Sequence, residues 1–118
     1  MERILSKVFI SNGDLMKEYT CVWDTGAMET TISNKVISDL NPQKEGGYVF
    51  LNTINGEKKS DKYIVIMCIE GHPKSFRLAP AVFGDSKDFD VIIGMDVINF
   101  GLFILDKGKF SFTIDQLK

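Results

Sequence analysis

The chain has 118 residues, enough for one hydrophobic core but too few for two ordinary domains, so we expect a single domain spanning residues 1–118. A hydrophobic fraction of 44% and a charged fraction of 25% are typical of a soluble globular protein. A formal net charge of -2 with no basic face argues against nucleic-acid binding, and no apolar run is long enough to span a membrane.

The expected location is cytoplasmic, because Met1–Leu5 lacks the long apolar segment of a signal peptide. Cys21 and Cys68 lie in apolar runs and are expected to be buried free thiols, since disulfides are rare in cytosolic proteins. One histidine, His72 in a surface turn, and two distant cysteines make no zinc constellation. We therefore expect no metal and no other cofactor.

The first elements predicted are two strands joined by a tight turn. Ile4–Ile10 and Met16–Trp23 are apolar enough for strands, and Asn12-Gly13 between them is a strong hairpin signal. The second strand leads directly to Asp24.

A short strand and a helix should follow. Thr30-Thr31-Ile32 is rich in β-branched residues, which favour strands. Ser33 is a good N-cap for a helix over residues 34–40, which Asn41-Pro42 ends. The composition of residues 43–47 predicts a loop.

The middle of the chain predicts a long hairpin. Its arms would be residues 48–54 and 63–69, with a tip near Asn55-Gly56 and the charged residues 57–62 as a solvated loop. A further strand over residues 75–83 is interrupted by Pro80, which is confined to strand edges or bulges.

The last elements predicted are a buried strand over residues 90–93, a short helix over residues 95–100 ended by Gly101, and a hairpin over residues 102–114. Many short strands separated by turn signals predict an all-β sandwich or closed barrel with one or two short helices.

Two motifs stand out against this pattern. The strand before Asp24-Thr25-Gly26-Ala27 ends abruptly in an acid, a hydroxyl and two small residues, an arrangement that can hold a carboxylate at the floor of a cleft. A second apolar strand, residues 90–93, also ends at a glycine. With the hairpin between them, these motifs resemble the retropepsin-like aspartic proteases over most of the chain.

The resemblance implies a closed, barrel-like acid protease fold, built as a single retropepsin-type lobe. It implies that Asp24 is catalytic, that Thr25 and Gly26 build the active-site loop across a dimer axis, and that Ala27 borders the substrate. The implied flap comprises Asn52, Thr53, Ile54, Asn55 and Gly56, within a tip spanning residues 52–58, and the second motif's supporting residues are Ile92, Ile93 and Gly94.

One acid cannot perform this chemistry alone. Hydrolysis of a peptide bond by carboxyl groups needs one as base and another as acid, and two that lie close together share a proton. The chain has no second Asp-Thr-Gly or Asp-Ser-Gly, and Asp90 and Asp96 are interpreted as turn or cap acids. We therefore expect a homodimer that cleaves a peptide or protein substrate, a two-fold pair being the commonest oligomer. The alternative is a catalytically silent retropepsin-fold module for dimerisation or peptide binding.

The sequence departs from the viral pattern at Met28 and Met95. Viral members usually carry an acid and an arginine at these places, which form an ion pair. Loss of both charges can be neutral, whereas loss of one is costly. We expect the two methionines to pack together and the chain to resemble cellular and bacterial members more than viral ones. Trp23 and Tyr48 could line the cleft or belong to the core.

Overall fold

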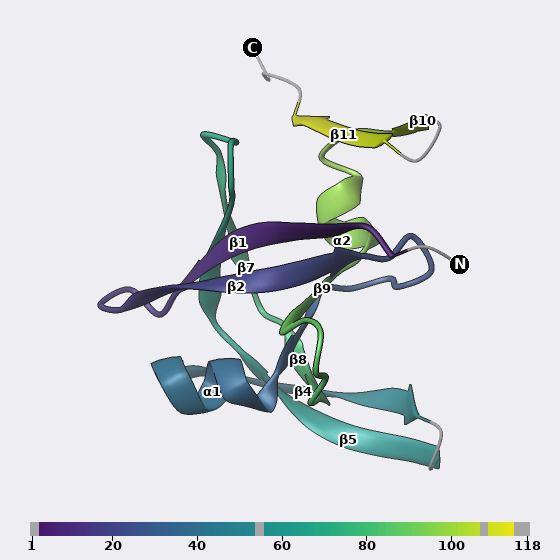
Figure 1. Ribbon diagram of the computed structural model, residues 1–118. Helices are drawn as coiled ribbons and strands as arrows, with labels where there is room; N and C mark the ends of the chain where they lie inside the picture. The colour runs from purple at the N-terminus through teal and green to yellow at the C-terminus, as the bar shows by residue number, and fades with distance from the viewer. Residues whose placement is uncertain (1–2, 54–55, 107–108, 115–118) are drawn as a thin grey trace.

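The computed structural model describes residues 3–53, 56–106 and 109–114, with only the backbone for residues 53 and 102–114. In these residues the fold is mostly β, with two short helices (Figure 1). The elements are β1 Leu5–Ser11, β2 Met16–Trp23, β3 Thr31–Ser33, α1 Asn34–Leu40, β4 Lys44–Thr53, β5 Gly56–Tyr63, β6 Val65–Ile69, β7 Ser75–Leu78, β8 Ala81–Gly84, β9 Val91–Ile93, α2 Met95–Ile98, β10 Gly101–Asp106 and β11 Lys109–Ile114.

Seven strands form one sheet, in the order β7-β6-β1-β2-β9-β3-β8. Alternation along the strands builds its buried face, because successive side chains point to opposite sides of a sheet. Val8 of β1 pairs with Tyr19 of β2 and with Ile69 of β6, and all three side chains are buried. Alternate residues of β2, β6 and β9 extend the same core.

The centre of this sheet joins strands that are far apart in the sequence. β9 runs parallel to β2 and antiparallel to β3, so it lies between them. β2 and β9 therefore end at the same edge of the sheet, with Trp23 opposite Ile93. This edge carries the residues that follow both strands.

The predicted long hairpin is wrong in its second arm. The strand that returns beside β4 is β5, the charged segment that was expected to be a solvated loop. A two-stranded hairpin can expose both faces, so its strands need no apolar alternation. Within β5 only Ser60 is buried; its hydroxyl accepts a hydrogen bond from the Val82 N–H and ties the hairpin to β8.

The residues assigned to that arm form β6 instead. Val65, Met67 and Ile69 alternate and are buried, which an exposed hairpin could not provide. β6 pairs with β1 and β7 inside the main sheet.

The loop predicted over residues 43–47 is also wrong, because β4 begins at Lys44. Four residue steps along β4, from Lys44 to Tyr48, face two along β5, from Tyr63 to Asp61. The extra residues form a bulge, and Gly46, with φ of 110°, has the backbone freedom it needs. The glycines that suggested a loop therefore lie in a strand that contains a bulge.

The C-terminal part follows the predicted order. α2 is shorter than expected: it ends at Ile98 with Asn99 as its C-cap, and Gly101 begins β10 instead of capping the helix. The β10–β11 hairpin lies beyond α2, on the side of the molecule away from β4 and β5 (Figure 1). Among the described residues, no helix is long and apolar enough to cross a membrane.

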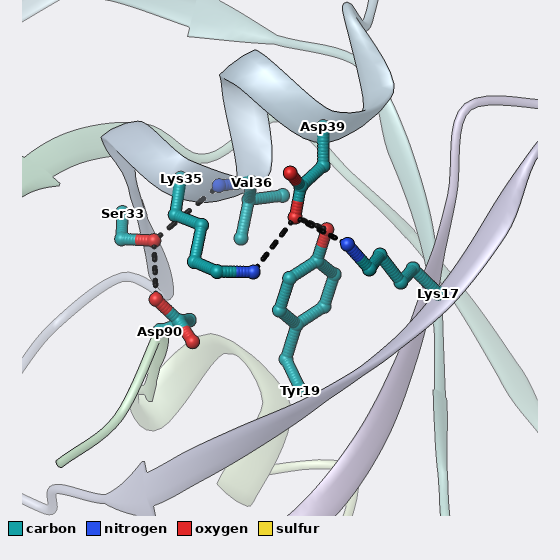
Figure 2. A network of polar contacts seen from close by, with 7 residues as sticks. All are labelled: Lys17, Tyr19, Ser33, Lys35, Val36, Asp39 and Asp90. Carbon is teal, nitrogen blue, oxygen red and sulfur yellow. Dashed lines mark hydrogen bonds and ion pairs between the residues drawn. The ribbon is translucent and has the colours of Figure 1, made fainter.

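The predicted helix α1 is confirmed, together with its cap. The Ser33 hydroxyl accepts a hydrogen bond from the Val36 N–H and donates one to Asp90, which joins the cap to the start of β9 (Figure 2). At the other end, Asn41 adopts a left-handed conformation and its N–H donates to the Ile37 carbonyl.

Asp39 attaches α1 to β2. One of its carboxylate oxygens accepts hydrogen bonds from Lys17 at 3.1 Å, Lys35 at 3.0 Å and the Tyr19 hydroxyl at 2.9 Å (Figure 2). These bonds, Lys35 first, lower the pKa of Asp39 to about 2. Burial, with Asp39 nearby, raises the pKa of Tyr19, so the phenol stays protonated as a donor.

Replacement of this carboxylate should weaken the fold in a pH-dependent way. We expect Asp39→Asn to lower the free energy of unfolding at pH 7 by about 1 kcal/mol, a modest value because both lysines are half-exposed. The folded-state pKa lies below the ordinary value of 3.8, so this stabilisation is present above about pH 4 and is lost as the pH falls towards 2. Urea unfolding of both proteins across this range measures it.

Asp61→Asn is the matched control, since Asp61 pairs only with the exposed Lys44 among the described side chains. It should change stability less than Asp39→Asn. A stability difference for Asp39→Asn that stays constant from pH 7 to pH 2 would contradict the assignment.

Candidate active site

Asp24 follows β2 directly, at the edge where β2 and β9 both end. Its N–H donates to the Ile93 carbonyl at 2.9 Å, which continues the parallel pairing one residue past the strand. Buried Trp23 and Ile93 therefore fix the backbone at Asp24, while its side chain is exposed.

The loop after Asp24 orients the carboxylate. The Gly26 N–H donates to Asp24 Oδ1 at 2.8 Å, and the Ala27 N–H donates to the Asp24 carbonyl at 3.1 Å. A Cβ at Gly26 would lie 3.2 Å from Asp24 Oδ1, so a side chain there would press on the carboxylate. One carboxylate oxygen is thus fixed by the backbone, and Thr25 is exposed at the tip of the loop.

Gly94, which follows β9, packs directly against this loop. A Cβ at Gly94 would lie 2.7 Å from the carbonyl carbon of Glu29 and 2.8 Å from the Ala27 oxygen, both backbone atoms. The N–H groups of Met95 and Asp96 donate to the Ala27 and Met28 carbonyls at 2.8 and 3.2 Å. The second motif therefore holds the first by backbone contact.

A polar pair, buried Thr30 and half-buried Asp96, completes this junction. Thr30 is 1% exposed, and its hydroxyl donates to Asp96 Oδ1 at 2.7 Å while accepting from the Gly94 N–H at 3.1 Å. The Thr30 N–H also donates to both carboxylate oxygens at 3.0 Å. Asp96 accepts from the Val97 N–H as well, but it lies in the first turn of α2, and the N-cap of this helix is Gly94.

The sequence did not reveal this pair. Thr30 and Asp96 are 66 residues apart, and each fits a local role as a strand residue or a helix-cap acid. The signal would have been the burial of Thr30, because a buried hydroxyl requires a partner. That burial follows only from the folded sheet.

The expected packing of Met28 against Met95 is wrong. Met95 is partly buried against the core, but the Met28 side chain is 79% exposed. The Met28 carbonyl accepts from the Asp96 N–H, and the loop turns its side chain outward. The junction that the ion pair makes in viral members is made here by backbone contacts and by Thr30 with Asp96.

A cleft of about 740 Å³ lies between the Asp24 loop and β4. One wall comes from the loop and the strand after it; it comprises Asp24, Gly26, Ala27, Met28, Glu29 and Thr31. The facing wall is Val49, Phe50, Leu51 and Asn52 of β4, with Ile92 and Asp96 completing the lining. The carboxylate thus borders a cavity of a size suited to part of a peptide.

The predicted flap is only partly within the described structure. Asn52 lines the cleft, and Gly56 begins β5 with φ of 104°. Ile54, Asn55 and the side chain of Thr53 lie outside the described residues. Val49, Phe50 and Leu51, which the sequence did not single out, contribute more of this wall than the expected tip.

The two aromatic residues considered for the cleft do not line it. Trp23 is buried, and its indole N–H donates to the Ser6 hydroxyl at 2.9 Å. Tyr48 is exposed, in edge contact with Phe50, and Lys59 lies over its ring at 4.2 Å from the centroid. Of these aromatics only Phe50 borders the cavity.

The other reactive groups fit this site poorly. Both cysteines are free, and burial raises the pKa of the Cys21 thiol to about 12, so it is protonated at neutral pH. Within the described ranges, no group of three or more His, Cys, Asp or Glu residues could hold a metal ion. The Asp24 carboxylate is therefore the candidate reactive group of this cleft.

Comparisons with known proteins address the family and the fold. The profile of a family described as "Aspartyl protease" matches residues 7–97. A retropepsin-like aspartic protease from Rickettsia conorii is similar in structure, with a TM-score of 0.59 and 20% identity over 91% of this chain and 89% of that chain. The retroviral protease-like domain of Ddi1 from Leishmania major has a TM-score of 0.53 and 13% identity over 98% and 92% of the two chains. No curated protein sequence matches significantly.

At these identities the structural matches establish the fold, and the predicted retropepsin-type acid protease fold is confirmed. The two structures come from a bacterium and from a cellular protein, in agreement with the expected resemblance to non-viral members.

A side chain at Gly94 should disrupt the junction. Gly94→Ala would bring a Cβ against the backbone of Ala27 and Glu29, which cannot move aside as a flexible side chain can. We expect a loss of about 3 kcal/mol in the free energy of unfolding. Denaturant unfolding measures it.

Gly47→Ala in β4 is the control, because the atom nearest its Cβ is the flexible end of Glu45. It should cost less than about 1 kcal/mol. Equal costs for the two variants would show that the Gly94 contact does not constrain the fold.

Removal of the Thr30 hydroxyl should also be costly. Thr30→Val leaves the buried Gly94 N–H without its acceptor and removes one donor from Asp96. We expect a loss of about 2 kcal/mol in stability. Thr30→Ser keeps the hydroxyl and should retain most of it; a serine variant as unstable as the valine variant would point to lost packing instead.

Proposed function

This chain belongs to the aspartyl protease family, and on that basis we propose that it is a homodimeric aspartic endopeptidase in which each subunit contributes one Asp24 carboxylate. The observation that carries the proposal is the exposed Asp24 carboxylate, which the Gly26 N–H orients at the border of a cleft.

The cleft of one subunit offers no second acid in a matching position. Asp96 lines the cavity, but Thr30 engages its carboxylate. Glu29 lies on the same wall, without the strand-end backbone contacts that fix Asp24. A second copy of Asp24, brought close by a two-fold axis through the exposed loops, supplies the missing acid.

In the dimer the two carboxyl groups share one proton, because like charges at close range disfavour ionisation of both. The ionised member takes a proton from a water molecule as its oxygen attacks the peptide carbonyl carbon, and the protonated member gives its proton to the carbonyl oxygen. The tetrahedral intermediate then collapses: its C–N bond breaks, the amine leaves with the proton of the protonated member, and one hydroxyl of the intermediate gives its proton to the ionised member. A carboxylic acid, an amine and a pair that again shares one proton are the products.

The substrate lies between the loop and β4. Val49–Asn52 form the wall opposite Asp24, and an extended peptide beside them would be recognised as an added strand. Closure of this hairpin over the peptide would exclude water other than the attacking molecule.

Replacement of the acid should abolish cleavage. We expect Asp24→Asn to lower kcat/KM for any cleaved peptide by about a thousandfold or more, because an amide can be neither base nor acid here. Asp14→Asn, in the exposed β1–β2 turn, is the matched control and should keep full activity. Peptide-library cleavage with and without a statine-type inhibitor, together with solution mass, measures both activity and dimerisation.

Mixing the proteins tests whether the site is shared. Excess Asp24→Asn protein should reduce the activity of a fixed amount of wild-type protein, because mixed dimers have one acid. Activity unaffected by the variant, or a working monomer, would contradict a shared site. A dimer that binds peptides tightly but never cleaves them would instead favour a silent binding module.

A further inference from the structure

Glu29 is the acidic residue of the cleft to which the proposed chemistry gives no role. Asp24 is the proposed catalytic group, and Asp96 is engaged by Thr30. Glu29 is exposed and lines the cavity. In the part of the chain that the structure describes, its carboxylate has no hydrogen bond or ion pair.

The backbone of Glu29 is nevertheless held firmly. The carbonyl of Met28 before it accepts from the Asp96 N–H, and the N–H of Thr30 after it donates to the Asp96 carboxylate. Gly94 lies so near the Glu29 backbone that a Cβ added to it would be 2.7 Å from the Glu29 carbonyl carbon. The fixed backbone limits where the Glu29 carboxylate can reach, so binding a partner costs side-chain rotamer entropy but no ordering of the loop.

Glu29 shares the cleft with large apolar side chains as well as with polar ones. Met28 is 79% exposed and Phe50 is 56% exposed, both unusually open for large apolar side chains, and they line the same cavity from opposite walls. Among the described residues that line it, none is lysine or arginine. Lys59 of the facing hairpin lies over Tyr48, outside the lining.

We propose that Glu29 selects substrates with a lysine or arginine side chain, whose aliphatic part packs against Met28 and Phe50 while its cationic end pairs with the Glu29 carboxylate. Lysine and arginine combine a long apolar stem with a charged end, which matches an acid set among exposed apolar groups. Arginine can also stack on the phenyl ring.

This inference rests on the proposed function and deepens it. In a two-fold dimer the two copies of Glu29 lie symmetrically about the paired Asp24 residues. A basic side chain should therefore be favoured at corresponding positions on both sides of the cleaved bond.

Matched peptides test this preference. Each pair shares an apolar sequence and differs at one position, with lysine against norleucine or arginine against citrulline, so that only the charge changes. We expect kcat/KM for the charged peptide to be about three- to tenfold higher, the range of a partly screened charge-assisted pair. The preference should decrease as the salt concentration rises.

Variants assign the preference to Glu29. Glu29→Gln should reduce the charged-to-neutral ratio to about one, and Glu29→Lys should reverse it in favour of glutamate peptides. Glu18→Gln, an exposed acid on β2 outside the cleft, should leave the ratio unchanged. Wild-type cleavage with no preference for charge, or a preference that survives in Glu29→Gln, would overturn the inference while leaving the proposed protease intact.

Binding separates this inference from the proposed catalysis. The same peptide pairs are measured by fluorescence anisotropy against Asp24→Asn protein, with and without Glu29→Gln. Preferential, salt-sensitive binding of the charged peptide that requires Glu29 would support the inference even if no peptide is cleaved. Equal binding of charged and neutral peptides would overturn it.

Discussion

The hydrogen bonds between the Asp96 carboxylate and Thr30 join the two strand ends on which the site depends. One segment carries Asp24 and the other begins with Gly94, and the glycine lets their backbones meet. The buried hydroxyl and the carboxylate satisfy each other, so neither has an unpaired polar group inside the fold. Once these contacts are made, the inner side of the loop from Asp24 to Glu29 rests on the segment that begins with Gly94. The outer side of the loop is exposed to solvent.

This arrangement explains how a charged pair can be absent from the junction. Met28 and Met95 do not replace an ion pair by packing together; Met28 faces the solvent side of the loop instead. Backbone bonds to the Ala27 and Met28 carbonyls need no particular side chain. The Met28 side chain is therefore not needed in the junction, and it lines the cleft together with its neighbour Glu29.

The β4–β5 hairpin contributes the other half of the cleft under a different constraint. Among the described strands, β4 and β5 pair with each other alone, and the Ser60 hydroxyl and the Tyr63 N–H tie the hairpin to Val82 and Pro80. Its exposed faces tolerate charges on β5 and open aromatic side chains such as Tyr48 and Phe50.

The sequence by itself determined the local features: the strand that ends at Asp24, the Asn12-Gly13 turn, the Ser33 cap with its helix, and the glycine after β9. Each depends on neighbouring residues, through alternation, turn geometry or capping. Only the tertiary structure decided that β5 and not β6 returns beside β4, that Thr30 bonds to Asp96, and that Phe50 borders the cleft. The reason is physical: strand partners and burial depend on which distant segments share a core, and nearby residues do not encode that choice.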